Sequence, residues 1–253
     1  MARKDRPLPS TPAAAAAAAA AAGPPGASVP RAPVPVVLDD VKRHPAVVAY
    51  LDKANEYTGA IGYTEHGTRH ANLTASIAYN ILKRLGAEER QAQLAAIAGY
   101  LHDIGNLVGR MNHEYAGAVL ADRILEELGM EPPERAVVMG AIGNHEEPHG
   151  EPVSPVGAAV ILSDKSDVHR TRVRNPDPTT FDIHDRVNYA VEHSFLRVDE
   201  KSKTITLELT IDTTLSQVME YFEIFLTRMV MCRRAAAFLG CAFKLQINGV
   251  KLL

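Results

Sequence analysis

The sequence has few of the features that mark disulfide-rich, membrane-spanning or nucleic-acid-coating proteins. It contains two cysteines in 253 residues, Cys232 and Cys241, and no Cys-x-x-Cys pair, so we expect buried thiols in a reducing compartment, the cytoplasm. The formal net charge of −3 lacks the basic excess that binding to long nucleic acids requires. No segment reaches the length of a charge-free transmembrane helix, so we expect no membrane partner.

The first 37 residues contain few of the large apolar side chains that build a core. Ala13 to Ala22 is an unbroken alanine tract, and Gly23 to Pro35 is rich in proline and glycine. Arg3 and Lys4 precede the alanines as in a signal peptide, but the Leu and Val content of its apolar region is missing. This composition predicts a disordered tail over residues 1–37.

Helical patterns dominate residues 38–193, where apolar side chains recur at helical spacing between Gly, Pro and Asn boundaries. Asn112 is the expected N-cap of one of these helices, and Ser154 precedes the last of them. No strand pattern interrupts this region, which predicts an all-helical domain. We expect helices over 45–57, about 70–85, 88–104, 112–128, 132–142 and 154–164.

The pattern changes after His193. Phe195 to Val198 and Thr204 to Ile211 predict an antiparallel hairpin, because the second run alternates apolar and polar residues. A long helix is expected from about Thr214 to Leu239, followed by a strand around 243–247 and an Asn248-Gly249 turn before a short last strand. The chain is therefore predicted to be mainly α, with a β-β-α-β unit at 194–253.

The long predicted helix carries more apolar side chains than one hairpin can cover. Phe222, Phe225, Leu226 and Met229 recur on it at helical spacing. These residues either dock on the helical domain or form a homodimer contact, and we take the homodimer as the sharper hypothesis.

Histidines and carboxylates gather where the predicted helices begin or end. His102-Asp103 closes one helix, and further candidates lie before and after it. Imidazole and carboxylate ligands together suit Mn, Fe, Zn, Co, Ni or Mg better than calcium. The candidate ligands are His70, His102, Asp103, His113, His145 and Asp164, with His66 and His149 as additional candidates.

The order of these residues resembles the HD superfamily of metal-dependent phosphohydrolases over roughly residues 64–175. The sequence is most similar to the HD-GYP-like branch, although it departs from that branch at three places. Asn106 stands where the branch has Lys, Asn144 replaces the first His of a His pair, and 151–153 replace Gly-Tyr-Pro. The resemblance implies an HD-type helical bundle that binds a divalent metal and hydrolyses phosphate esters.

Within this resemblance, Asp103 is the residue expected to bridge two ions, because a carboxylate offers two oxygens. His70, His102, Asp103 and Asp164 would form one metal site, and His113 and His145 would hold a second ion. One or two ions are expected, since Asn144 weakens the second site. Lys165 is the expected catalytic partner of a substrate phosphate, beside Asp103. Arg170 and Arg172 either bind phosphate or line the surface.

The expected substrate is a small phosphate ester or nucleotide, as a monoester or a diester, and cyclic-di-GMP is disfavoured because Gly-Tyr-Pro is absent. Two other functions stay open. An HD-type di-iron oxygenase would use the same ligands to bind iron and activate oxygen. A degenerate HD module would bind a nucleotide or a partner without catalysis.

Overall fold

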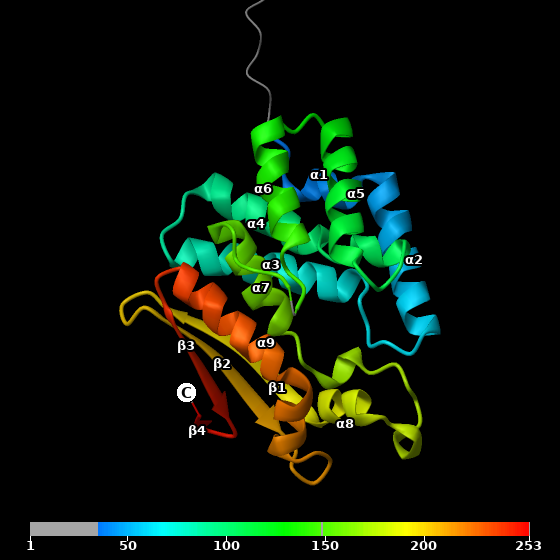
Figure 1. Cartoon of the computed structure of the whole chain (residues 1–253), viewed down its shortest axis with the longest axis vertical. Helices are drawn as coiled ribbons and strands as arrows, with labels where there is room; N and C mark the ends of the chain where they lie inside the picture. The colour runs from blue at the N-terminus through cyan, green and yellow to red at the C-terminus, as the bar shows by residue number, and fades with distance from the viewer. Residues whose placement is uncertain (1–34, 148, 253) are drawn as a thin grey trace, which may run out of the picture. The chain divides into compact units, whose positions relative to one another are not determined.

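The computed structural model describes residues 35–147 and 149–252, which belong to one compact unit that begins at Pro35. Residues 1–34 of the predicted tail lie outside the described residues. The described part is mainly helical with a small C-terminal sheet (Figure 1), which confirms the predicted fold class. Its helices are α1 (Leu38–Arg43), α2 (Pro45–Ala60), α3 (Thr68–Arg84), α4 (Glu89–Leu101), α5 (His113–Glu127), α6 (Pro132–Gly143), α7 (Pro155–Lys165), α8 (Ile183–Ala190) and α9 (Val218–Phe238), with 3₁₀ turns η1 (Ile104–Leu107), η2 (Arg170–Arg172) and η3 (Pro178–Thr180).

Helix α4 forms the centre of the helical part. Every residue from Leu94 to Leu101 is buried, because α4 packs against α3, α6 and α7. Such an all-round apolar helix is typical of a core position. The His102-Asp103 pair follows directly at its C-terminal end, so the centre of the fold and the candidate ligands coincide.

Two glycines permit the close packing around this pair. A Cβ at Gly99 would lie 3.1 Å from the Thr74 carbonyl oxygen of α3, which explains how α3 and α4 approach so closely. A Cβ at Gly105 would overlap the His113 carbonyl oxygen and the Gly117 backbone nitrogen of α5. Gly105 therefore lets the first turn of α5, which carries His113, lie against the His102-Asp103 turn.

The sheet has the strand order β1 (Val191–Asp199), β2 (Thr204–Ile211), β3 (Ala242–Ile247), β4 (Val250–Lys251). β1 and β2 form the predicted antiparallel hairpin, and β3 runs parallel to β2 because α9 returns the chain across the sheet (Figure 1). Asn248 and Gly249 both have positive φ, as a tight hairpin turn requires. The β-β-α-β order is thus confirmed.

Helix α9 packs between this sheet and the helical part. Phe225 and Met229, predicted for a surface contact, are buried, and α9 contacts α7, β2 and β3. Met219 and Leu226 stay 66% and 56% exposed. Docking within the chain therefore accounts for most of the apolar face, and the homodimer stays a prediction.

Two predicted domain limits and the end of one predicted helix differ from the described structure. Val36 is buried and its carbonyl oxygen accepts a 2.7 Å hydrogen bond from Arg90 Nη1, so the core begins inside the predicted tail. β1 begins at Val191, before the predicted boundary at 193, and one hydrophobic core continues across that boundary. α4 ends at Leu101, because the chain turns at His102-Asp103 into η1.

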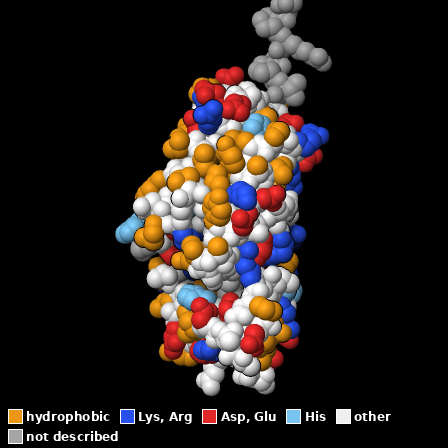
Figure 2. Space-filling view, turned by 90° about the vertical axis from the view of Figure 1, so that its right-hand side faces the viewer, with side chains coloured by type: hydrophobic (Ala, Val, Ile, Leu, Met, Phe, Trp, Pro, Cys, Tyr) orange, Lys and Arg blue, Asp and Glu red, His pale blue; other side chains and the backbone are white. Residues whose placement is uncertain are grey.

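The surface shows no segregation of charge on the face drawn in Figure 2, where acidic, basic and hydrophobic side chains are interspersed. Among the helices of the described residues, none combines the length and apolar character that crossing a bilayer requires.

Candidate metal centre

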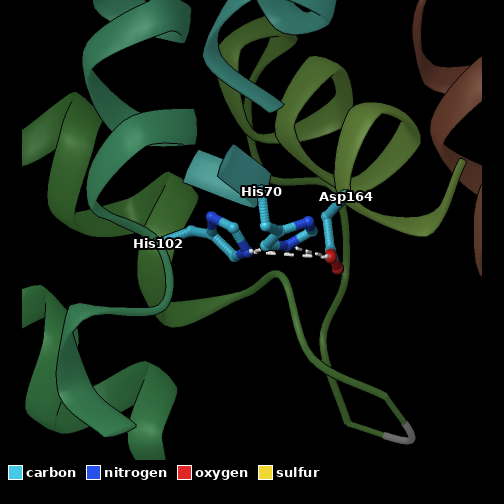
Figure 3. Close-up of side chains that lie close together, drawn as sticks. All are labelled: His70, His102 and Asp164. Carbon is cyan, nitrogen blue, oxygen red and sulfur yellow. Dashed lines mark hydrogen bonds and ion pairs between the residues drawn. The ribbon is translucent and has the colours of Figure 1, made fainter. Parts of the chain in front are cut away.

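The six candidate ligands converge from five segments of the helical part. Three of them are drawn in Figure 3, where His70 from α3, His102 and Asp164 from α7 point toward one another. His113 opens α5, and His145 follows the end of α6. All four histidines and Asp103 are buried, and Asp164 is nearly so. The structure thus brings together His70, His102, Asp103, His113, His145 and Asp164.

Four of these residues form what we call the His70 pocket: His70, His102, Asp103 and Asp164. The Nε2 atoms of His70 and His102 lie 3.2 Å apart. Asp164 Oδ1 lies 3.3 Å from His70 Nε2 and 3.6 Å from His102 Nε2. Asp103 Oδ2 lies 3.5 Å and 3.2 Å from the same two nitrogens. Two nitrogens and two carboxylate oxygens therefore surround one point.

Backbone and carboxylate acceptors fix the tautomer of each histidine ring. The Nδ1 atom of His70 donates to Asp167 Oδ2 at 2.7 Å, and that of His102 donates to the Gly99 carbonyl at 2.8 Å. His145 Nδ1 donates to the Ile142 carbonyl at 2.6 Å. A neutral ring with its proton on Nδ1 keeps a lone pair on Nε2. When both rings are neutral, the Nε2 lone pairs of His70 and His102 face each other, an arrangement that a cation between them stabilises.

The electrostatics of the His70 pocket also favour a cation. Burial disfavours charge on Asp103, but His102 and His113 hold the pKa of this carboxyl well below its usual range. Burial also opposes the charge of His102, yet Asp103 and Asp164 raise the pKa of His102 to about 10. Asp103 Oδ2 is buried without a hydrogen-bond donor among the described residues. The donor set and this unpartnered oxygen fit a divalent metal ion, which could displace the His102 proton.

A second group, the His113 pocket, consists of His113, His145, Glu146 and the other oxygen of Asp103. His113 Nε2 lies 3.2 Å from His145 Nε2 and 3.2 Å from Asp103 Oδ1. Glu146 Oε2 lies 3.9 Å from His145 Nε2. One oxygen of Asp103 thus faces each pocket, as expected for a bridging carboxylate.

Protein cations and donors already occupy the His113 pocket. Arg110 Nη1 lies 3.1 Å from His113 Nε2, and Arg110 Nη2 pairs with Glu146 Oε1 at 2.7 Å. Asn106 Nδ2 donates to Asp103 Oδ1 at 2.9 Å. The sequence reasoning missed Arg110, although the departure at Asn106 was a signal that this side of Asp103 differs from the family pattern.

Lys165 is fully buried and binds two carboxylates. Its Nζ lies 2.6 Å from Glu147 Oε2 and 3.0 Å from Asp164 Oδ2. Burial opposes its charge, but Asp164 and Glu147 raise the pKa of Lys165 above its usual value. Glu147 in turn accepts a 2.9 Å hydrogen bond from Arg228 Nε of α9. Lys165 therefore orients Asp164 and Glu147, and its contact with a substrate phosphate stays a prediction.

The remaining predicted residues lie around the two pockets. His66 precedes α3 in a loop and is buried, with its ring centroid 5.8 Å from that of His70. Burial and the nearby Arg172 lower the pKa of His66 well below its usual value, so this ring is neutral. His149 is exposed and belongs to none of the groups of potential ligands found among the described residues.

The two arginines predicted to bind phosphate have protein partners. Arg172 is buried and donates to the Glu65 carbonyl at 2.9 Å and to the Asp167 carbonyl at 2.8 Å, which ties η2 to the loop before α3. Arg170 pairs with Glu192 at 3.0 Å and lies over the Tyr189 ring. Both arginines therefore have structural contacts.

Asp167 is a functional candidate that the sequence reasoning did not single out. Besides accepting from His70 Nδ1, its carboxylate pairs with Arg69 Nη2 at 2.8 Å. Burial works against its charge, but Arg172 and His70 hold the pKa of Asp167 far below its usual range. Asp167 lies three residues after Asp164, about one helical turn further along the chain, and this spacing could have identified it as a candidate.

Comparisons with known proteins agree with this geometry. The family model of the HD domain matches residues 68–178. The chain is similar to the uncharacterized protein MJ1020 of Methanocaldococcus jannaschii, with 29% identity over 210 residues that cover 73% of this chain and 80% of the relative. No solved structure matches the chain significantly.

The matched segment contains His70, His102, Asp103, His113, His145 and Asp164, and thus every histidine and aspartate of the two pockets. The finer likeness to the HD-GYP-like branch stays a prediction. HD domains bind divalent metals, and their family consists generally of metal-dependent hydrolases. Residues 68–178 of this chain match the family model of the HD domain, which supports membership of the HD superfamily.

Proposed function

We propose that this protein is a phosphohydrolase that uses one divalent ion to hydrolyse a small phosphate ester or nucleotide. The observation that supports it most directly is the His70 pocket, where two Nε2 lone pairs, Asp164 Oδ1 and the unpartnered Asp103 Oδ2 face one point. This donor set matches the nitrogen and oxygen ligands of Mn, Fe, Co, Ni and Zn sites.

A metal ion held by His70, His102, Asp103 and Asp164 would neutralise phosphoryl oxygens and lower the pKa of a water molecule bound to it. The protein supplies the orientation of these ligands. Asp167 and the Gly99 carbonyl hold the rings of His70 and His102, and Lys165 holds Asp164. Such outer contacts fix ring direction and protonation before any ligand arrives.

A single ion is the stoichiometry we propose, because Arg110 supplies positive charge in the His113 pocket. Its guanidinium contacts His113 Nε2 and pairs with Glu146, and Asn106 donates to Asp103 Oδ1. A second ion would have to displace these donors. The same contacts disfavour the di-iron oxygenase, which needs both pockets.

The cavity beside the pockets supports a small substrate. It has a volume of about 360 Å³, which is at the lower end of ligand cavities, roughly 300–1000 Å³. His66 and Arg110 line it. Because Arg110 also contacts His113, the cavity opens next to the metal ligands.

The proposed function is tested by loading the purified protein with Mn, Fe, Co, Ni, Zn or Mg and assaying nucleotides and aryl phosphate mono- and diesters. We expect turnover with at least one ion, loss of turnover with chelator, and none in the Asp103→Ala variant. Arg123→Met, which alters an exposed arginine of α5 paired with Glu127, is the matched control and should retain activity. Metal content and nucleotide binding that are both unaffected by Asp103→Ala would favour the binding-module alternative.

A further inference from the structure

The cavity beside the metal centre has walls from both parts of the chain. His66 and Arg110 come from the helical part, and Phe225 and Arg228 come from α9. Arg110 and Arg228 bring positive charge to this cavity, which Arg172, Asp182 and His184 also line. α9 is outside the segment that the HD family model matches, which ends at residue 178.

Contacts with Glu147 and Phe225 position the Arg228 side chain, but they use only part of its guanidinium group. Its Nε donates to Glu147 Oε1 at 2.9 Å, and its guanidinium carbon lies 4.9 Å from the centre of the Phe225 ring. The side chain is 22% exposed. Within the described residues, 35–147 and 149–252, no acceptor lies in hydrogen-bond reach of its Nη1 or Nη2. Arg228 lines the cavity, and its Nη1 and Nη2 have no acceptor among the described residues.

Glu147 cannot neutralise Arg228 alone, because it is shared with a second cation. Its other oxygen, Oε2, lies 2.6 Å from Lys165 Nζ, and Lys165 also contacts Asp164. The chain of contacts from Asp164 through Lys165 and Glu147 therefore positions Arg228 relative to the His70 pocket.

We infer that Arg228 is a substrate-binding residue, which takes a phosphate group of the ester on its two free nitrogens. A planar guanidinium with two unpaired N–H edges matches the oxygens of a tetrahedral phosphate. The inference rests on the proposed function for the identity of the ester. It assigns to the C-terminal unit the role of completing the active site.

The test compares Arg228→Met and Arg228→Lys with Arg234→Met. Arg234 lies on the same helix and pairs with Glu151 at 2.6 Å, but it is 51% exposed and absent from the cavity walls. Binding of inorganic phosphate to the metal-loaded full chain is measured by calorimetry, and thermal melting checks the fold of each variant. Loss of two charge-assisted hydrogen bonds should weaken phosphate binding by roughly a hundredfold or more in Arg228→Met.

We expect Arg228→Lys to bind phosphate with intermediate affinity, because an ammonium restores the charge but not the planar fork. Arg234→Met should bind as the wild type does. With an ester that is turned over, Arg228→Met should raise KM more than it lowers kcat, while bound metal stays unchanged.

Equal phosphate affinity in the wild type and Arg228→Met would overturn the inference, as would equal weakening in Arg234→Met. Unchanged affinity in a stably folded Arg228→Lys would show that a point charge suffices and would overturn the forked contact. The two proposals fail separately. If no ester is hydrolysed but phosphate binding depends on Arg228, only the hydrolase proposal fails; if esters are hydrolysed with an unchanged KM in Arg228→Met, only this inference fails.

Discussion

The His70 pocket and the His113 pocket use the same kinds of ligand but differ in what already fills them. In each, two histidine Nε2 atoms lie 3.2 Å apart beside one oxygen of Asp103. In the His70 pocket, Lys165 contacts Asp164 through Oδ2, whereas Oδ1 faces the histidines, and Asp103 Oδ2 lacks a donor among the described residues. In the His113 pocket, Arg110 and Asn106 supply the donors. Ligand type alone therefore does not determine how many ions a site of this kind takes; the neighbouring donors also count.

The largest effect is expected from Asp103, which the two pockets share. Asp103→Ala should reduce bound metal to background and lower activity by more than about a hundredfold. A loss of about a hundredfold is the upper end for removing a residue that only supports a metal ligand. Elemental analysis and turnover of the two purified proteins provide the measurement. Equal metal content would remove Asp103 from the ligand set.

A paired substitution separates the two pockets directly. His70→Ala should remove most of the metal, whereas His113→Ala should leave close to one ion per chain, because only the His70 pocket is free to bind one. Equilibrium dialysis against Mn or Zn measures both. If His113→Ala loses as much metal as His70→Ala, the two pockets act as one site and the comparison is wrong.

Arg110→Met should convert the His113 pocket into a metal site. Removal of the guanidinium frees His113 Nε2 and Glu146, so bound metal should rise from one ion toward two per chain at saturating concentration. Arg123→Met is the control and should stay at one. A stoichiometry of two in the wild type would show that the ion displaces Arg110.

The smallest effect is expected from Asp167→Asn, which keeps the shape but removes the charge behind His70. Metal affinity should fall by about tenfold to a hundredfold, as for other outer contacts of metal ligands. Because the folded-state pKa of Asp167 is depressed, its stabilisation is present above the unfolded pKa of about 3.9 and is lost as pH falls below it. The difference in Tm between wild type and variant should therefore be largest near neutral pH and shrink below about pH 4. A constant difference over that range would contradict the assignment.

Local pattern was enough to predict the helices, because the spacing of the apolar residues reveals where they begin and end. The convergence of His70, His102 and Asp164 was predicted from the resemblance to the HD superfamily. The departure at Asn144 also indicated a weaker second pocket. The roles of Arg110, Glu147 and Arg228 could not be predicted. Their partners lie 36 and 81 positions away in the sequence, and such long-range pairs leave no periodic signal.

Lys165 illustrates the same limit. Its adjacency to Asp164 predicted a place near the site, but adjacency does not reveal which acceptors surround an ammonium. The structure places Glu147 on its other side, so its charge is used within the protein. Likewise, the start of β1 at Val191 depends on pairing with Ile211, since residues 191–194 show no alternation of apolar and polar side chains.

The contact between Glu147 and Arg228 has a practical consequence for anyone who shortens this protein. A chain cut after α8 would retain every predicted metal ligand, yet it would lose the guanidinium that balances Glu147. The cut would also strip α9 from α7 and expose to water a surface that is now covered. The smallest portion that preserves both the charge balance and the covered face of α7 must therefore extend through α9. It must also include β3, because the sheet covers Phe225 and Met229.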